Sequence, residues 1–158
     1  MWGSDDSSDD EWDCTPRAPS APSKGNASEI LSGHLYLGDF TSANYPERVY
    51  THVISFGTPK EHFRYTPPLK DFHHTRIILD DVDDAPISSH FEQCFDIIDS
   101  NDCVLIHCWA GISRSATVVL AYLMQRKRMT LDVAWCFVKE RRSCINPNDG
   151  FIRALELL

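Results

Sequence analysis

Short apolar runs alternate with amphipathic stretches along most of the chain. The apolar runs predict strands over residues 30–37, 53–56, 75–79 and 103–106, the first ending in a turn at Gly38. Apolar residues at helical spacing predict helices over 42–49, 90–98, 115–126 and 150–158, and a further helix that Thr130 caps and Pro147 stops. Such alternation predicts an α/β fold with a small, mostly parallel central sheet flanked by helices.

Two parts of this pattern predict the centre of the fold. Residues 103–106 predict a central strand that leads directly into His107 and Cys108, and residues 115–126 are apolar nearly all round, which predicts a buried helix. Gly57, Thr58 and Pro59 open what we expect to be an irregular loop. A second loop, between a strand and a helix, holds four acids at 80, 81, 83 and 84.

The first 28 residues differ from the rest of the chain. They are rich in Ser, Asp and Pro with few apolar residues, so we expect a disordered acidic tail at 1–28 and one folded catalytic domain at 29–158. Six acids against two bases give the tail a charge of −4, half of the net −8. Ser7 and Ser8 precede acids and resemble sites for an acidophilic kinase of the casein kinase 2 type.

Composition narrows the classes of function. A 158-residue chain with 42% hydrophobic and 24% charged residues fits one globular domain. Its negative charge disfavours binding to nucleic acid or to anionic membranes. We expect a cytoplasmic or nuclear location, because the start lacks a signal-peptide pattern and no apolar run is long enough for a membrane span. The six cysteines form no CxxC pair, and most are expected to be buried apolar residues.

Candidate chemistry lies in residues 107–115, with the sequence HCWAGISRS. A loop between a buried strand and the start of a helix aims backbone N–H groups and the helix dipole at one point, where phosphate binds well. Gly111 lets the backbone approach a ligand. The same field favours the thiolate of Cys108. The planar fork of Arg114 can bind two phosphate oxygens, which a lysine could not do.

This loop resembles the HCxxGxxR signature of the protein tyrosine phosphatase superfamily. The variant HCWAGISRSA is similar to that of the dual-specificity protein phosphatases. Because the chain shows no N-terminal kinase-docking domain, it looks like their small atypical type. The resemblance covers about residues 28–158 and includes LYLG at 35–38, AYLM at 121–124 and RRSCINPNDGF at 141–151. It implies a protein tyrosine phosphatase-like fold with the phosphate-binding loop between a central strand and a buried helix.

The resemblance also implies roles for individual residues. Cys108 would be the nucleophile that forms a phosphocysteine, and Ser115 would assist departure of its thiolate. His107 would order the loop and support the thiolate, and Asn148 would support the loop. Phosphate would be bound by the loop residues Trp109, Ala110, Gly111, Ile112, Ser113 and Arg114.

The leaving hydroxyl needs a proton that the loop cannot supply. Counting back from Phe91, the family's general acid matches Asp81, with Asp80 as the nearest alternative and Asp83 as a weaker one. We expect no metal and no other cofactor, because the cysteines and histidine around the loop lack a second pair of ligands.

The function expected from these features is hydrolysis of phosphotyrosine and phosphoserine/threonine in phosphorylated protein substrates. One alternative is a phosphate-binding pseudophosphatase or scaffold, although the cysteine, the arginine and an acid are all present. Phosphoinositide and RNA 5′-phosphatases are a weaker alternative, because Trp109, Ala110, Ile112 and Ser113 are uncharged in an acidic protein. The pattern predicts neither the physiological substrate nor the oligomeric state.

Overall fold

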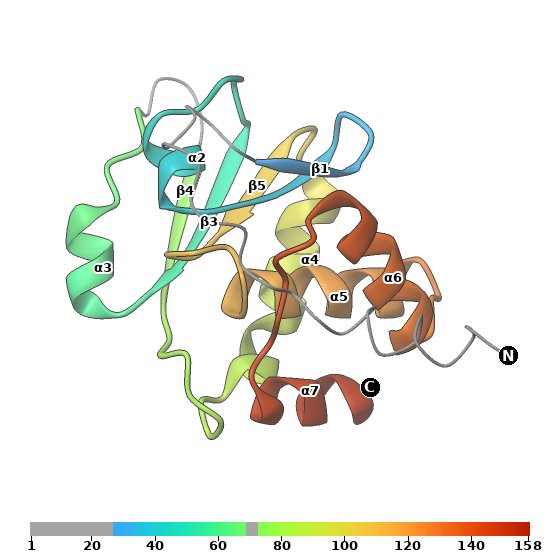
Figure 1. Ribbon diagram of the computed structural model, residues 1–158. Helices are drawn as coiled ribbons and strands as arrows, with labels where there is room; N and C mark the ends of the chain where they lie inside the picture. Colours follow the sequence, from blue (N-terminus) through green and yellow to red (C-terminus); the bar gives the residue numbers. More distant parts are fainter. Residues whose placement is uncertain (1–26, 69–72) are drawn as a thin grey trace, which may run out of the picture.

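A twisted sheet forms the centre of the molecule in the computed structural model, which describes residues 27–68 and 73–158 (Figure 1). Within these residues the sheet has five strands in the order β1-β2-β5-β3-β4. β1 is antiparallel to β2, and the other neighbours are parallel. The strands are β1 (Ser28–Leu31), β2 (Leu35–Gly38), β3 (His52–Gly57), β4 (His73–Ile78) and β5 (Val104–His107). The predicted α/β class with a mostly parallel sheet is confirmed. The predicted tail lies almost wholly outside the described residues.

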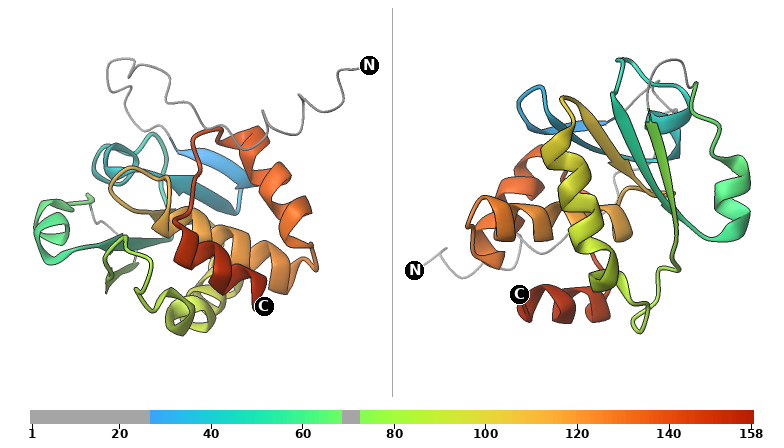
Figure 2. Two further views of the ribbon diagram at one scale, coloured as in Figure 1. Left: turned by 60° about the horizontal axis from the view of Figure 1, so that its bottom comes forward. Right: turned by 180° about the vertical axis from the view of Figure 1, so that it is seen from behind.

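Helices cover both faces of the sheet (Figure 2). One face packs on α5, with α4 and α6 beside it, while the other face packs on the short α2. α7 packs on the outer side of α5. The helices are α2 (Phe40–Asn44), α3 (Pro59–Arg64), α4 (Phe91–Ser100), α5 (Arg114–Arg126), α6 (Leu131–Arg141) and α7 (Asp149–Glu156), with a 3₁₀ turn η1 (Ile87–His90) before α4.

Residues of the inner strands alternate between these two faces. Leu35 and Leu37 belong to the larger core cluster under α5, whereas Tyr36 between them belongs to a smaller cluster with α2. Every residue of α5 from Arg114 to Leu123 is buried. The prediction of a helix buried all round is therefore confirmed, and this helix begins one residue earlier than expected.

Three segments differ from the prediction. Residues 30–37 form a β-hairpin, β1 and β2, because Gly33 adopts a left-handed φ of +67° and turns the chain between them. The predicted helix over 42–49 is instead α2, which begins earlier because Asp39 and Ser42 form a capping box. The expected irregular loop after Gly57 contains α3, which starts with another capping box, between Thr58 and Glu61.

The cysteines are less buried than expected. Of the described cysteines besides Cys108, only Cys94 is buried. Cys136 lies on the exposed side of α6, and Cys103 and Cys144 are partly exposed. Among the described helices, none has the length and apolar character needed to cross a bilayer.

Parallel pairing has one consequence for the site. The carboxyl ends of β2, β5, β3 and β4 lie at the same edge of the sheet, and the segments that follow them meet there. These segments hold the residues 107–115, the helix α3 and the acidic loop after β4. The topology therefore gathers residues that are up to about 70 positions apart in the sequence, such as Phe40 and Trp109.

The packing of α5 predicts a large cost for truncating its core side chains. Leu120 is fully buried, so Leu120→Ala should lower the free energy of unfolding by about 2–5 kcal/mol. Val133→Ala on α6 is the control, since Val133 is 55% exposed and should lose less than about 1 kcal/mol. Urea unfolding followed by circular dichroism measures both, and equal losses would contradict the buried position of α5.

Candidate active site

The segment from Cys108 to Ser113 forms a tight loop between β5 and α5. Gly111 at its middle adopts a left-handed φ of +67°, which turns the backbone. The backbone N–H groups of residues 109–113 have no acceptor among the described residues. Several free donors thus surround the start of α5, where the helix dipole also favours negative charge. This arrangement suits a bound oxyanion.

Cys108 lies at the base of this loop. Its Sγ is 3.0 Å from Ser115 Oγ, and both side chains are buried. Ser115 sits in the first turn of α5, one residue after Arg114. A serine hydroxyl at this distance can donate a hydrogen bond to a thiolate. The structure thus brings together the predicted nucleophile and the residue predicted to assist its departure.

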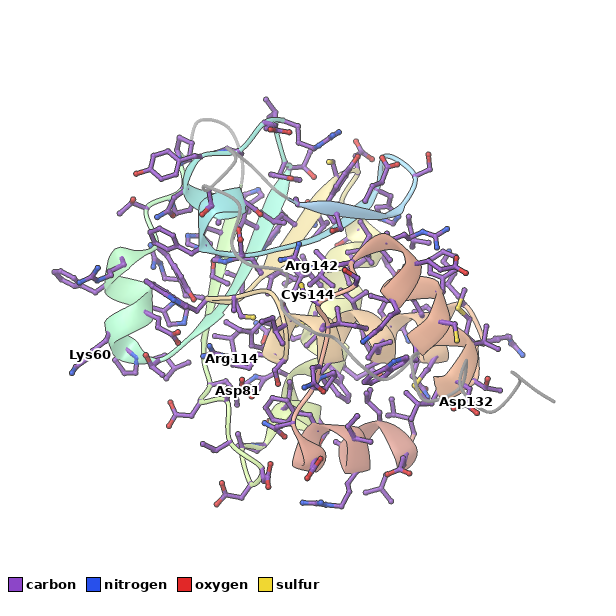
Figure 3. The ribbon with its side chains drawn as sticks, viewed as in Figure 1. Lys60, Asp81, Arg114, Asp132, Arg142 and Cys144 are labelled. Carbon is purple, nitrogen blue, oxygen red and sulfur yellow. The ribbon has the colours of Figure 1, made fainter. Side chains whose placement is uncertain are left out.

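Glu61 of α3 holds the guanidinium of Arg114. Its Nη1 donates to Glu61 Oε1 at 2.7 Å and to the carbonyl of Leu79 at 3.0 Å, and its Nη2 donates to Glu61 Oε2 at 3.2 Å. The buried Nε of Arg114 has no acceptor among the described residues. The guanidinium of Arg114, labelled in Figure 3, is therefore fixed through Nη1 and Nη2, and its Nε is left for a ligand.

The two partners of this pair stay ionised. Burial is the largest single effect and raises the pKa of Glu61 and lowers that of Arg114. The hydrogen bonds between the two groups, the backbone hydrogen bond from Thr58 to Glu61 and the nearby opposite charges together outweigh it. As a result the pKa of Glu61 is lowered and that of Arg114 is raised. Sequence reasoning missed Glu61, although the motif Thr58-Pro-Lys-Glu61 is a capping-box signal for a helix start.

His107 contacts the start of the loop through a neutral imidazole. Burial lowers the pKa of His107 to about 3. Its Nδ1 lies 3.1 Å from the carbonyl of Cys108, which can only accept, so Nδ1 carries the proton. Nε2 then accepts from the hydroxyl of Ser55 at 2.5 Å, and Ser55 Oγ in turn accepts from Nε2 of His74 at 2.7 Å. This directed chain fixes the carbonyl of Cys108, and sequence reasoning had not included Ser55.

Asp81 is held by two hydrogen bonds, one from the loop and one from the start of α7. Its Oδ1 accepts from Ser113 Oγ at 2.7 Å and from Asn148 Nδ2 at 2.8 Å, and its Oδ2 has no partner among the described residues. Asp80 and Asp83 make no side-chain hydrogen bond in the described part of the chain. Of these three acids, Asp81 is the one whose side chain is bonded to the loop.

Asn148 holds Asp81 and starts α7 at the same time. Its Oδ1 accepts from the amide of Phe151 at 2.9 Å, which caps the helix, while its own amide donates to Ser113 Oγ at 3.1 Å. A Cβ at Gly150 would lie 1.8 Å from the carbonyl oxygen of Asp83, so only glycine allows α7 to approach the acidic loop this closely. Asn148, the residue predicted to support the loop, thus forms hydrogen bonds with both Ser113 and Asp81.

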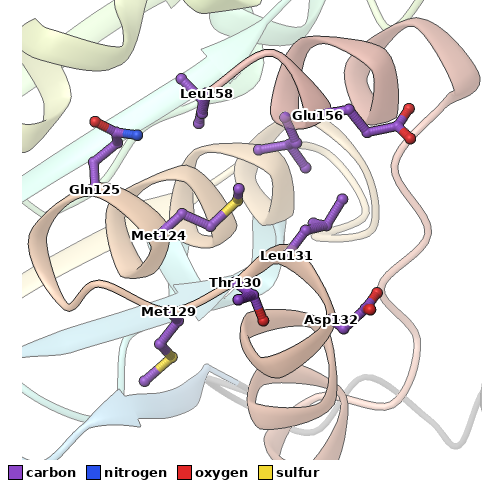
Figure 4. A pocket seen from close by; sticks show the side chains of 9 residues that line it. Met124, Gln125, Met129, Thr130, Leu131, Asp132, Glu156 and Leu158 are labelled. Atoms are coloured by element: carbon purple, nitrogen blue, oxygen red, sulfur yellow. The ribbon is translucent and has the colours of Figure 1, made fainter.

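A separate surface pocket lies at the other end of α5 (Figure 4). Met124 and Gln125 of α5, Leu131 of α6 and Glu156 of α7 contribute to its lining. Ten residues of helix separate Arg114 from Met124, or about 15 Å. This pocket is therefore not part of the loop region.

Comparisons with known proteins agree with this geometry. Residues 35–158 match the sequence model of the dual specificity phosphatase catalytic domain. The chain is 42% identical over 139 residues to a probable rhodanese domain-containing dual specificity protein phosphatase of Dictyostelium discoideum. It is 37% identical over 137 residues to dual specificity protein phosphatase 15 of Mus musculus. These matches cover 82% and 81% of the chain but only 28% and 55% of the relatives.

Among solved structures, the fold is similar to that of the human tyrosine phosphatase-like serine/threonine/tyrosine-interacting protein. The two share 34% identity with a TM-score of 0.77, over 83% of this chain and 93% of the other. The structural similarity thus covers most of both chains. The chain spans about half or less of the length of the curated relatives above.

The Glu61–Arg114 pair predicts a pH-dependent stability. Because the pKa of Glu61 is lowered on folding, the pair stabilises the fold above the ordinary glutamate pKa, and this contribution is lost as pH falls through the lowered pKa. The melting temperature of wild type should therefore exceed that of Glu61→Gln at neutral pH, and the difference should shrink below about pH 4.5. Thermal unfolding between pH 7 and pH 3 measures this difference.

Glu140→Gln is the matched control for this experiment. Glu140 is 77% exposed and lies 3.7 Å from Arg141, so its removal should change the melting temperature little at any pH. A difference between wild type and Glu61→Gln that stays constant from pH 7 to pH 3 would contradict an ionised Glu61.

Proposed function

Because the chain belongs to the dual specificity phosphatase catalytic domain family, we propose that it hydrolyses phosphotyrosine and phosphoserine/threonine in proteins through a phosphocysteine intermediate. One observation carries this proposal. Around the thiol of Cys108, the loop amides and Arg114 Nε are donors that no described residue satisfies. A phosphate dianion supplies the acceptors that such a set of donors requires.

In the first step, the thiolate of Cys108 attacks phosphorus and the bond to the leaving oxygen breaks. The loop amides and Arg114 bind the three remaining oxygens and stabilise charge as the phosphoryl group transfers. Asp81, protonated on Oδ2, donates its proton to the leaving oxygen as the bond breaks. The hydrogen bonds from Ser113 and Asn148 to Oδ1 keep this carboxyl oriented.

In the second step, water attacks the phosphocysteine. Asp81, now ionised, accepts the proton from water, and inorganic phosphate forms as the sulfur–phosphorus bond breaks. Ser115 donates a hydrogen bond to the departing thiolate, consistent with its distance of 3.0 Å. His107, which is neutral, takes no part in proton transfer and holds the carbonyl of Cys108.

The alternative of a pseudophosphatase without turnover is not favoured. Such a binding module needs the phosphate donors but neither a nucleophile nor an acid, whereas this chain places Cys108, Ser115 and Asp81 around the same loop. For phosphoinositide or RNA 5′-phosphatases, additional basic side chains on the loop would be expected, and residues 109–113 carry none.

We also propose that the protein works in a reducing compartment of the cell, cytoplasmic or nuclear. The five described cysteines are free, and a thiolate nucleophile requires reducing conditions. Phosphorylation of Ser7 or Ser8 by an acidophilic kinase remains a prediction from the sequence.

Removing the nucleophile tests the proposed function directly. Cys108→Ser should abolish hydrolysis of an aryl phosphate and of phosphopeptides, while inorganic phosphate should still bind, because backbone amides and Arg114 supply the donors. Steady-state kinetics and isothermal titration calorimetry measure the two effects. Cys94→Ser is the control, since Cys94 lies on the buried face of α4, outside the loop, and this variant should keep the wild-type turnover. Hydrolysis by Cys108→Ser above 1% of the wild-type rate would remove Cys108 from its role.

Replacing the acid tests the proposed proton donor. Asp81→Asn should lower kcat on phosphothreonine peptides by about 10²–10⁴, because an alkoxide must be protonated as it leaves. It should lower kcat far less on an aryl phosphate with a good leaving group. Asp80→Asn and Asp83→Asn are matched controls and should show no dependence on the leaving group. The same dependence in either control, and not in Asp81→Asn, would assign the proton to that neighbour.

A further inference from the structure

The carbonyl groups of the loop need hydrogen-bond donors of their own. A short turn that presents its N–H groups to a ligand directs its C=O groups outward, where each needs a donor. Two of these donors are backbone amides: Phe40 N donates to Trp109 O at 3.0 Å, and Asn146 N donates to Ile112 O at 2.7 Å. The two carbonyls at the middle of the loop, those of Ala110 and Gly111, depend on a side chain.

That side chain is Arg142, at the end of α6. Its Nε donates to Gly111 O at 2.9 Å and its Nη2 donates to Ala110 O at 3.3 Å. Its Nη1 reaches Ser28 Oγ at 3.3 Å, at the start of β1. Arg142 is only 7% exposed. One planar guanidinium therefore bonds two adjacent carbonyls, a geometry that its rigid fork allows.

Gly111 and Arg142 depend on each other. A Cβ at position 111 would lie 2.4 Å from Arg142 Nη2, so the absence of a side chain leaves room for the guanidinium. Gly111 is also the residue with left-handed φ, which turns its carbonyl away from the site. The glycine thus meets two requirements, a backbone conformation and the close approach of a cation.

We propose that Arg142 is a positioning residue for the phosphate-binding loop: by bonding the carbonyls of Ala110 and Gly111 from behind, it keeps the neighbouring amides directed at the phosphate. This inference rests on the proposed function and adds to it a residue that does not touch the substrate. Its positive charge lies on the side of the loop away from Arg114 (Figure 3). Without Arg142, two carbonyls would be free to rotate toward the ligand, where they would repel an oxyanion.

The test uses a probe that needs no turnover. The dissociation constant of inorganic tungstate, a tetrahedral oxyanion, is measured by isothermal titration calorimetry on wild type and three variants. Arg142→Met should raise this constant about tenfold and lower kcat/KM on an aryl phosphate at least as much. Arg142→Lys, which keeps the charge but cannot span both carbonyls, should raise it about threefold.

Arg141→Met is the matched control. Arg141 is the preceding residue, lies on the exposed side of α6 and stacks over Phe137, so its removal should leave tungstate affinity within about twofold of wild type. Melting temperatures are recorded for all variants. A merely structural role would reduce the fraction of competent protein, and hence the binding stoichiometry, without changing the dissociation constant.

A folded Arg142→Met with a tungstate dissociation constant within twofold of wild type would overturn the proposal. If Arg142→Met does not fold, a tungstate dissociation constant of Arg142→Lys within twofold of wild type would overturn the proposal instead. A wild-type protein that binds tungstate but does not hydrolyse phosphopeptides would overturn the proposed function alone, because the binding comparison between variants would still stand.

Discussion

Each carbonyl from Cys108 to Ser113 must find a donor outside the loop if the loop's amides are to face a dianion. A buried carbonyl left without a donor costs about 1–3 kcal/mol, so several such groups would consume much of the stability of a small domain. The donors come from several parts of the fold: His107, Phe40, Arg142, Asn146 and Thr117. The phosphate-binding loop is therefore a property of the whole domain.

The parallel sheet explains how these donors reach the loop. β5 lies between β2 and β3, so the carboxyl ends of its neighbours flank the loop on both sides. The end of β2 continues to Phe40, and the end of β3 leads to α3 and Glu61. The ion pair between Glu61 and Arg114 is largely buried, and removing one partner of such a pair leaves an uncompensated charge. The position of α3 is thus tied to the orientation of Arg114.

Local geometry also explains how a chain with a net charge of −8 can form a binding site for an anion. At physiological ionic strength the Debye length is about 8 Å, so distant surface acids contribute little to the field at the loop. Nearby groups dominate: the free amides, the start of α5 and the guanidinium groups of Arg114 and Arg142. The acids next to the loop are held in directed bonds, Glu61 to Arg114 and Asp81 to Ser113 and Asn148.

The sequence by itself determined the α/β class, the burial of α5 and the loop with Cys108, Arg114 and Ser115, because strand, loop and helix are consecutive and their periodicity is local. The prediction missed the β-hairpin at Gly33, because a turn inside an apolar run depends on backbone angles that periodicity does not report. It also missed the helix α3, because only the capping box of Thr58 and Glu61 indicates this helix and no apolar period accompanies it. Only the tertiary structure decided that Glu61 holds Arg114, that Ser55 holds His107, and that Arg142 holds the loop carbonyls. These pairs are 53, 52 and about 30 residues apart, and a contact at that separation arises from strand order and helix packing, which no local pattern encodes.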